Sequence, residues 1–309
     1  EAFVASMAVS GSTLYVGGWF DTIGGQPRGH IAAFNTNTGH LTPWNPGINT
    51  HVWAMEVSGS TLYVGGNFEG CAGQKRWGLA AFDMSTGELT PWNPETWDPL
   101  IGGGGQVYSL ACAGSTVYVG GHFGKIGGQV RTNIAALDAT VNTNNATAWN
   151  PVSIDASTIH YGQVMGLAVY GSTVFAAGEF TRIGGQDRNG LAALYRDSDT
   201  DNAKDWVPCE GTGGRLRGTC LLISGQSLYV GSCQDIVAQK YGPARFNLGE
   251  CTLSLDVNPP EAGSIVSDPV PSLGVDGYEQ DTVVTLAAQV SPGYLFTGWS
   301  GDLTGTANP

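Results

Sequence analysis

One position that follows a repeated glycine pair carries a different side chain in each copy of a repeated phrase. The residues there are Trp19, Asn67, His122 and Glu179, and a fifth copy has Cys233 at the same place. An aromatic face can stack on a ligand such as a sugar, while amide, imidazole and carboxylate groups can hydrogen-bond to it. This set therefore predicts a site for a polar ligand or a glycan. The alternative is an exposed position at which the residue type is free to vary.

Alternating carboxylates form a second candidate site in the segment RDSDTDNAKDW. The candidate metal ligands are Asp197, Asp199 and Asp201. Carboxylate oxygens spaced along a loop can surround Ca²⁺. The segment lacks the glycine and the terminal glutamate of a helix-loop-helix calcium site, so the alternative is a solvated acidic turn. Ca²⁺ is the only cofactor that the sequence suggests.

The acidic residues available for glycoside hydrolysis are few and scattered. Glu56 is the one acid in the first run of any copy, and Asp21, Glu69 and Glu179 lie near the ends of predicted strands. Such an enzyme needs two carboxyl groups roughly 5 to 9.5 Å apart. No G-x-S-x-G, H-E-x-x-H or phosphate-binding motif suggests another chemistry. We therefore expect a protein that is not an enzyme, with a glycoside hydrolase as the less favoured alternative.

Four of the six cysteines fall in or beside the fifth copy of the repeat. They are Cys209, Cys220, Cys233 and Cys251. This copy has lost residues that pack the others, and a disulfide would offset that loss. Cys71 and Cys112 stand where other copies have aliphatic residues, which indicates small buried side chains, with a bridge between the two as the alternative. None of the six forms a C-x-x-C pair, so a metal or redox role is not indicated.

The elements that must position these side chains are copies of one unit. The phrase GSTLYVGG returns, with changes, at intervals of 48 to 57 residues, which indicates a supersecondary unit repeated in tandem. Each copy contains four short runs rich in Val, Tyr, Phe, Thr and Trp, separated by glycine-containing turns. The phrase begins at Gly11, Gly59, Gly114, Gly171 and Gly225.

Four strands per copy predict the blade of a β-propeller. The first run has small residues between apolar ones, which suits an innermost strand that packs on both faces. The fourth run ends in Trp-Asn-Pro in three copies, and proline belongs at a strand end or a sheet edge. We therefore expect an all-β fold. It consists of a five-bladed β-propeller over residues 1–251 and a small C-terminal β-rich module over residues 252–309.

The GSTLYVGG, IGGQ, R-x-x-IAAF and WNP elements resemble those of the bacterial delta-sixty repeat propellers. The resemblance covers residues 3 to about 255, and four of the five copies match well. The fifth, LYVGSCQDIVAQKYGPARF, lacks the later glycine pair and Trp-Asn-Pro. The resemblance implies a secreted or cell-surface β-propeller of bacteria, from a family without assigned catalytic residues.

The phrase GYLFTGWSGDLTG, residues 293–305, resembles the divergent form of the internalin-B-type B repeat. That family consists of small β-rich modules that occur in strings on bacterial surface proteins. Its pattern continues beyond the position of Pro309, so we expect residues 252–309 to form part of such a module.

Residues that recur in the well-matched copies are expected to be scaffold. An arginine before the third run can satisfy several loop carbonyls at once, and a tryptophan in the fourth run can seal the gap between neighbouring blades. The residues are Arg28, Arg76, Arg131 and Arg188, and Trp44, Trp92, Trp149 and Trp206.

Charge narrows the class of partner. The chain has 13 basic and 26 acidic side chains, a formal charge of −13. An acidic surface does not follow a phosphate backbone, and no apolar run is long enough to span a bilayer, so we expect neither nucleic acid nor membrane insertion. The sequence predicts an extracellular or cell-surface, non-catalytic protein that acts as an adhesive, matrix or filament-forming element. Its expected partners are other copies of itself or cell-surface components; the alternative is a glycan-binding lectin.

Overall fold

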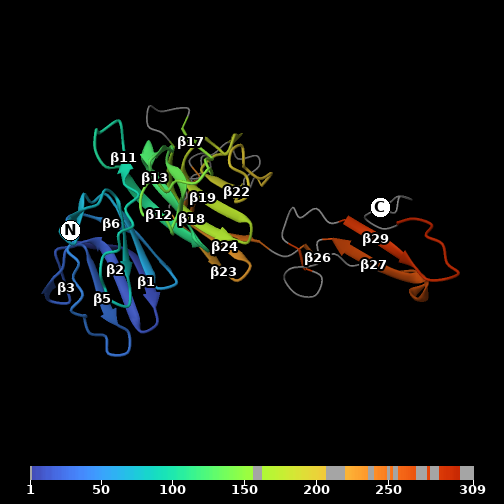
Figure 1. Cartoon of the computed structure of the whole chain (residues 1–309), viewed down its shortest axis with the longest axis horizontal. Helices are drawn as coiled ribbons and strands as arrows, with labels where there is room; N and C mark the ends of the chain where they lie inside the picture. The colour runs from blue at the N-terminus through green and yellow to red at the C-terminus, as the bar shows by residue number, and fades with distance from the viewer. Residues whose placement is uncertain are drawn as a thin grey trace. The chain divides into compact units, whose positions relative to one another are not determined.

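The computed structural model describes residues 2–155, 162–206, 220–235, 240–248, 251–252, 257–268, 277–278 and 285–299. The chain divides into two compact units, one of residues 1–223 and 228–246 and one of residues 224–227 and 247–309. Both are built from β-strands, and the described helix is a single 3-10 turn, η1 (Pro260–Ala262) (Figure 1). In the described part of the chain, no helix is long and apolar enough to cross a bilayer.

Each repeat forms a three-stranded antiparallel sheet. In the first repeat β1 (Phe3–Ser10) pairs with β2 (Thr13–Trp19), which pairs with β5 (Ile31–Asn35). The same order recurs in four further sheets. These are β6 (Val52–Ser58), β7 (Thr61–Gly66) and β10 (Leu79–Asp83); β12 (Gln106–Ala113), β13 (Thr116–His122) and β16 (Ile134–Asp138); β18 (Gln163–Tyr170), β19 (Thr173–Glu179) and β22 (Leu191–Tyr195); and β23 (Cys220–Ser224), β24 (Ser227–Asp235) and β25 (Lys240–Asn247).

The fourth run of the first four repeats makes a single bridge where the sequence predicts a strand. In the first repeat the bridge joins Phe34 to Leu41. The equivalent bridges are Phe82–Leu89, Leu137–Ala146 and Leu194–Ala203. The ladder ends after one pair because the chain turns toward the next repeat, and the proline of Trp-Asn-Pro has no N–H to donate to a ladder.

A short hairpin follows the second strand at the IGGQ element. In the first repeat it consists of β3 (Thr22–Ile23) and β4 (Gln26–Pro27), and Gly24 and Gly25 at its tip have φ of 58° and 73°. Glycine enters this left-handed region without steric cost. The equivalent hairpins are β8 (Gly70–Cys71) with β9 (Gln74–Lys75), β14 (Lys125–Ile126) with β15 (Gln129–Val130), and β20 (Arg182–Ile183) with β21 (Gln186–Asp187).

Backbone pairing also ties neighbouring repeats together. The segment after Trp92 forms β11 (Thr96–Trp97), which pairs with the β14 strand of the next repeat. At the following junction β17 (Ser153–Ile154) pairs with β20 in the same way. These pairings hold the hairpins against the preceding repeat and build the surface between repeats.

The glycine pair at the end of the second strand fits the junction between repeats. The inner strands β1, β6, β12 and β18 contact one another in chain order. A Cβ on Gly17 would lie 2.5 Å from Val52 Cγ1 of the next inner strand, so only glycine leaves room for the valine. The second glycine, Gly18, lies against the carbonyl of Phe3 beside a bulge in β1. The relation of Gly17 to Val52 recurs between Gly65 and Val107 and between Gly120 and Val164.

The recurring arginines hold loop carbonyls. Arg188 donates hydrogen bonds to the carbonyl oxygens of Asp187 at 2.9 Å and Lys204 at 2.7 Å. Equivalent pairs of bonds are made by Arg28, Arg76 and Arg131. A guanidinium suits this role because its donors diverge in one plane. The interpretation of these arginines as scaffold is confirmed.

The recurring tryptophans join one repeat to the next. Trp44 Nε1 donates to the carbonyl of Gly87 at 2.9 Å, and its ring packs edge-on against Phe82, with centroids 5.3 Å apart. Trp149 Nε1 donates in the same way to the carbonyl of Tyr195 at 2.9 Å. The role predicted for these rings as seals between repeats is confirmed.

Closure of the repeats into a ring is not established by the described strands. The five repeat sheets follow one another, and none of the described sheets closes on itself. The first inner strand exposes Val4, Met7 and Val9. An all-β repeat fold is therefore established, and closure into a five-bladed propeller stays a prediction.

The second unit contains two short antiparallel ladders. In one, β26 (Cys251–Thr252) pairs with β28 (Gly277–Tyr278), and in the other β27 (Gly263–Asp268) pairs with β29 (Thr285–Val290). The predicted boundary between residues 251 and 252 falls within β26. In the GYLFTGW phrase, Phe296 and Trp299 pack edge-on with centroids 5.1 Å apart. The assignment of this unit to the internalin-B-type family stays a prediction.

Candidate functional site

The variable position lies at the end of the second strand in each repeat. Trp19, His122 and Glu179 end β2, β13 and β19, and Asn67 directly follows β7. Each of the four lies opposite a residue at the start of the inner strand. Those partners are Phe3, His51, Gln106 and Gln163. The contacts of the four predicted residues gather into two groups, and the side chain of Cys233 is not among those described.

Trp19 and Asn67 meet through His51. The Trp19 ring packs edge-on against the imidazole of His51 with centroids 4.3 Å apart, and His51 Nδ1 lies 3.2 Å from Asn67 Oδ1. The ring of Trp53 stacks on the same imidazole, with centroids 4.9 Å apart and planes 6° apart. Phe3 packs against both tryptophans. Since Trp19 is exposed, this aromatic and imidazole group presents an apolar surface to solvent.

The neighbouring His30 has a structural role. Burial lowers the pKa of His30, the positive charge of His51 would lower it further, and Asp21 opposes the change. Its Nδ1 accepts a hydrogen bond from the backbone N–H of Phe20 at 3.3 Å. The ring is therefore held neutral, with its proton on Nε2, and supports the turn after β2.

His122 and Glu179 belong to a second group that surrounds a buried carboxylate. His122 Nδ1 lies 3.3 Å from Oδ2 of Asp98, which is buried. Tyr108, on the inner strand, donates a hydrogen bond of 2.5 Å to Gln106 Oε1. Burial raises the pKa of Tyr108 to about 12, and the negative charges of Asp98 and Glu179 add to the rise. Both carboxylates therefore lie within electrostatic reach of the Tyr108 hydroxyl.

The buried carboxylate of this second group, Asp98, is bound by the loop that it belongs to, residues 98–103. Asp98 Oδ1 accepts the N–H of Leu100 at 2.8 Å, and the Asp98 N–H donates to the carbonyl of Gly103 at 2.8 Å. His122 Nε2 is buried without a hydrogen-bond partner among the described residues. The contact between His122 and Asp98 joins the end of β13 to the 98–103 loop.

His51, Trp53 and Asp98 were not among the residues predicted from the sequence. His51 and Trp53 flank Val52, and Trp53 lies at the bulge between Val52 and Ala54, which breaks the simple alternation of the strand. Asp98 lies in extra residues before β12, and the interval of 55 residues between the second and third phrases, against 48 between the first two, was the available signal.

The acidic segment forms an exposed turn. Asp197, Asp199 and Asp201 are all exposed, and the Asp199 carbonyl accepts the N–H of Asn150 at 2.6 Å. No three His, Cys, Asp or Glu side chains in the described part of the chain lie close enough together to hold a metal ion. The calcium site stays a prediction, as does the alternative of a solvated turn.

The described cysteines carry free thiols. Cys71 is buried, Cys112 is half-buried and Cys220 is exposed, and none of these three is paired. Cys209 lies outside the described residues, and for Cys233 and Cys251 only the backbone is described. The interpretation of Cys71 as a small buried residue is confirmed, and the disulfide of the fifth repeat stays a prediction.

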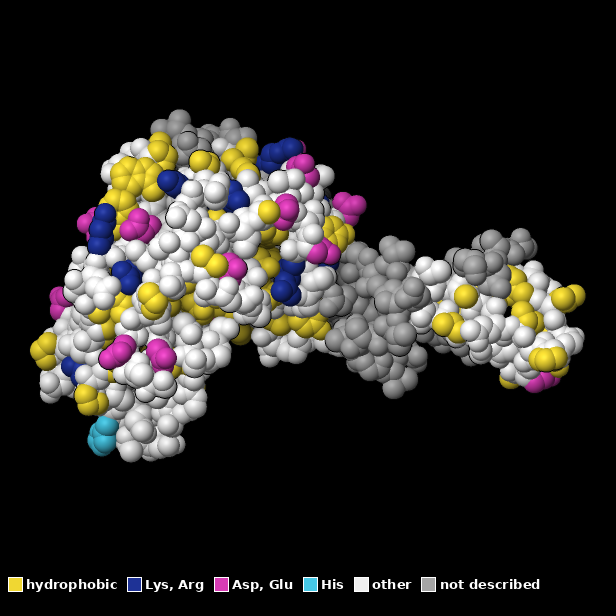
Figure 2. Space-filling view, viewed as in Figure 1, with side chains coloured by type: hydrophobic (Ala, Val, Ile, Leu, Met, Phe, Trp, Pro, Cys, Tyr) yellow, Lys and Arg dark blue, Asp and Glu magenta, His cyan; other side chains and the backbone are white. Residues whose placement is uncertain are grey.

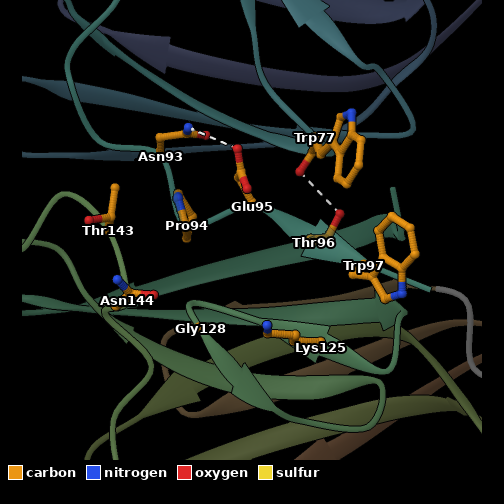
Figure 3. A pocket seen from close by; sticks show the side chains of 10 residues that line it. All are labelled: Trp77, Asn93, Pro94, Glu95, Thr96, Trp97, Lys125, Gly128, Thr143 and Asn144. Atoms are coloured by element: carbon orange, nitrogen blue, oxygen red, sulfur yellow. Dashed lines mark hydrogen bonds between the residues drawn. The ribbon is translucent and has the colours of Figure 1, made fainter. Parts of the chain in front are cut away.

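A groove that the sequence analysis missed opens between the second and third repeats. Its volume is about 690 Å³ (Figure 3). The walls come from the loop before β10, from the segment 93–97, from the β14–β15 hairpin and from a turn at residues 143–144. Figure 3 shows Trp77 and Trp97 on one side of the groove and Thr143 and Asn144 on the other.

The aromatic side of the groove is anchored by backbone contacts. The rings of Trp77 and Trp97 lie with centroids 5.3 Å apart and planes tilted by 32°. Thr96, which directly precedes Trp97, is buried, and its hydroxyl group donates a hydrogen bond to the Trp77 carbonyl at 3.0 Å. The ammonium of Lys75 lies 3.9 Å from the centre of the Trp77 ring, a favourable cation–π geometry. Both indoles remain half-exposed.

The same groove recurs at the next junction without tryptophan. It has a volume of about 310 Å³, and Val152 there has φ of 44°, close to the 46° of Glu95 in the larger groove. The places of the two tryptophans are taken by Thr132 and Ile154. Repetition of the scaffold therefore builds the groove, and the aromatic pair belongs to one copy of it.

Comparison with known proteins supports the repeat type. A family model described as "Domain of unknown function (DUF5122) beta-propeller" matches residues 13–37. This match supports a propeller-type repeat family. No curated protein matches the chain. Among the solved structures that are similar to this chain are two computationally designed proteins, Ika8 (TM-score 0.43, 14% identity, 77% of this chain and 72% of that chain) and Ika4 (TM-score 0.39, 14% identity, 66% and 94%).

Proposed function

We propose that this chain is a secreted or cell-surface, non-catalytic protein that serves as an adhesive, matrix or filament-forming structural element. The observation that supports the proposal is the open face of the first repeat. Val4, Met7 and Val9 on β1 are 47, 66 and 61% exposed. Their counterparts in the second repeat, Val52 and Met55, are 0 and 7% exposed because the first repeat covers them. An apolar face of this kind is a marker of association.

The fifth repeat leaves the complementary face open. Tyr229 on β24 is 38% exposed. At the same place the earlier repeats have aromatic residues that are 3 to 7% exposed: Tyr15, Tyr63, Tyr118 and Phe175. Gly231, also on β24, is the counterpart of Gly17 in the sequence, and Cys220 Sγ of its own repeat lies beside it. The exposed Tyr229 therefore supports an open face on the fifth repeat, opposite in kind to the open face of β1.

Joining the two open faces in different copies produces an end-to-end contact. Such a heterologous contact generates open fibres when its rotation does not close, and rings when it does. Joining the same two faces within one chain would instead close the five-bladed propeller that the sequence predicts. We propose the contact between copies, with the fifth repeat of one copy on β1 of the next.

The acidic residues support a non-catalytic role. The carboxylate of Glu56 is largely buried and accepts a hydrogen bond from the backbone of Cys112. Glu179 lies near Tyr108, and Asp21 is exposed near His30, with 3.9 Å between Asp21 Oδ1 and His30 Nε2. Glu56, Glu179 and Asp21 have separate surroundings, whereas a glycoside hydrolase holds two carboxyl groups on one substrate. Asp98, which shares the neighbour Tyr108 with Glu179, is buried and accepts a hydrogen bond from its own loop.

The charge distribution supports protein or glycan partners. On the face that Figure 2 shows, lysine and arginine side chains are scattered among aspartate and glutamate. Nucleic-acid binding proteins instead collect basic residues into one patch or stripe. With a formal charge of −13, the chain is suited to partners other than polyanions.

The test is the mass of the full chain by sedimentation velocity over a wide range of concentration. We expect the mass to rise with concentration and the Met7→Glu variant to weaken the association at least tenfold. Val130→Glu is the matched control, because Val130 is an exposed valine on β15, away from the open face. It should associate as the unchanged chain does.

A monomer at every concentration would overturn the proposed assembly. If Met7→Glu then also lowered the melting temperature while Val130→Glu did not, the open face would be covered within the chain, as closure of the five repeats requires. Equal weakening by both variants would show that the association is non-specific.

A further inference from the structure

We propose that the groove between the second and third repeats is a binding site for a neutral saccharide, with Trp77 and Trp97 as its stacking surface. No property of this site depends on the end-to-end assembly described above. Its volume of about 690 Å³ falls within the usual range of small-molecule sites.

The tryptophans are not required by the scaffold. At the next junction the groove forms with Thr132 and Ile154 in their places. At the first junction the same two places hold Gly29 and Asn49. A half-exposed indole pair in only one copy leaves apolar surface in water, which is unfavourable unless a ligand covers it. The scaffold tryptophans, in contrast, recur in every well-matched repeat and seal the junctions.

The two indoles suit a flat ligand with an apolar face. Their centroids are 5.3 Å apart with a tilt of 32°, so the two rings pack against each other and form one aromatic cluster. Gly104 leaves space for Trp77, since a Cβ there would lie 3.3 Å from the Trp77 side chain. Lys75 occupies one face of Trp77, which fixes the ring in place. The pyranose ring has C–H groups on its faces and can pack on such a cluster as other apolar groups do.

The rest of the groove offers hydrogen bonds. Glu95, Lys125, Thr143 and Asn144 line it and are exposed. Glu95 Oε1 accepts a weak hydrogen bond of 3.4 Å from Asn93 Nδ2, which leaves most of its capacity for a ligand. Carboxylate, ammonium, hydroxyl and amide groups can together accept from and donate to several hydroxyl groups.

Charge favours a neutral saccharide over the other candidates. Glu95 and Lys125 put one carboxylate and one ammonium in the same groove, so neither a polyanion nor a polycation is matched. A proline-rich peptide also binds to aromatic grooves, but its side chains offer few groups for the four polar residues opposite the tryptophans. The hydroxyl groups at several positions of a sugar ring match these four polar residues better.

The test is a microarray of neutral and uronic-acid-containing oligosaccharides probed with the full chain. Titration calorimetry then follows on the strongest neutral ligand. Trp97→Ala should raise the dissociation constant at least tenfold, with unchanged circular dichroism and melting temperature. Tyr294→Ala is the control, because Tyr294 is an exposed aromatic residue outside the groove, and it should bind as the unchanged chain does. Trp19→Ala tests the other glycan site, which the sequence predicts.

A second variant should gain a binding site, and a gain cannot be explained by loss of folding. The double variant Thr132→Trp, Ile154→Trp places an aromatic pair in the smaller groove, and we expect the stoichiometry to rise from one site toward two. The proposal would be overturned if no neutral saccharide bound at millimolar concentration. It would also be overturned if binding survived Trp97→Ala but was lost in Trp19→Ala, or if only proline-rich peptides bound. Repeating the titration with Met7→Glu separates this site from the assembly, since the variant should retain the ligand.

Discussion

Val52, on the inner strand of the second repeat, lies directly over Gly17 of the first. A Cβ atom at Gly17 would be 2.5 Å from Val52 Cγ1 and 3.3 Å from Met55 Sδ. Val52 is buried, so it cannot move away without disturbing its neighbours. Val52 therefore occupies the space that a side chain at residue 17 would need. The same pairing of glycine and valine recurs at the next two junctions.

This packing relation predicts how much one added methyl group at residue 17 lowers the stability of the fold. Gly17→Ala should lower the free energy of unfolding by about 1–3 kcal/mol, the usual range for overpacking a close-packed interior. Urea denaturation measures the change. Gly103→Ala is the control, because Gly103 has open space around its Cα and does not have positive φ, and we expect a change within about 0.5 kcal/mol.

A double variant identifies the cause of that cost. In a Val52→Ala background the contact with the valine methyl groups is gone, so Gly17→Ala should cost much less than it does alone. An unchanged cost in that background would show that the loss comes from the backbone of β2 and would contradict the packing relation.

Two scaffold tryptophans are expected to respond differently to loss of the indole N–H. Trp149 and Trp92 are both buried, but only Trp149 Nε1 has a partner, the carbonyl of Tyr195 at 2.9 Å. Trp92 Nε1 is buried and has no hydrogen-bond partner within the described part of the chain. Trp149→Phe should therefore cost about 1 kcal/mol more than Trp92→Phe, since it breaks a hydrogen bond to the Tyr195 carbonyl and Trp92→Phe breaks none among the described residues. Thermal and urea denaturation of the two variants check this, and equal costs would contradict it.

Glu56 makes the stability depend on pH. Burial raises the pKa of Glu56, and the hydrogen bond from the Cys112 backbone opposes that rise only in part. The folded chain therefore binds this proton more tightly than the unfolded chain, and the stabilisation is complete below the unfolded pKa. It is lost as the pH rises through the folded pKa.

Glu56→Gln should remove that loss, because glutamine resembles the protonated acid. We expect the variant to gain stability over the unchanged chain as the pH rises from about 4, the region where an ordinary glutamate titrates, toward 7. Glu88→Gln, an exposed carboxylate, controls for removing one negative charge from an acidic protein. A gain that is equal at pH 4 and pH 7 would rule out the burial of Glu56 as its cause.

Features that depend on recurrence could be predicted from the sequence. Val52 and Gly17 keep their types in several copies, so the repeat, its strands and the scaffold role of Arg188 and Trp149 follow from the pattern. The fourth strand could not be obtained in this way, because whether Leu41 continues a ladder depends on where the chain must go to reach the next repeat.

The candidate sites depend on features that occur once. Trp77 departs from the residue type of the other copies at its place, and this departure was visible in the sequence. Its proximity to Trp97 was not, because the two are brought together by the pairing of β11 with the next repeat. In the same way Asp98 reaches His122 only through an inserted loop.

The buried thiols are expected to resist alkylation. Burial raises the pKa of Cys71 to about 12, with Arg76 opposing the rise, and burial together with the charge of Glu56 raises the pKa of Cys112 to about 12. Since the thiolate is the reactive form, both thiols should react slowly at pH 8. Cys220 is exposed and has no such protection.

The measurement is iodoacetamide labelling of the mildly reduced, folded chain at pH 8, followed by peptide mass mapping over time. Cys220 should be labelled first, and Cys71 and Cys112 only after denaturant is added. Labelling of Cys71 as fast as Cys220 would show that the packing around it opens readily, and the burial argument would fail.

A parallel sample without reduction addresses the fifth repeat, because Cys220 that is labelled only after reduction must have been in a disulfide. Labelling of Cys220 without reduction would instead leave Cys209, Cys233 and Cys251 as the remaining candidates for that bond.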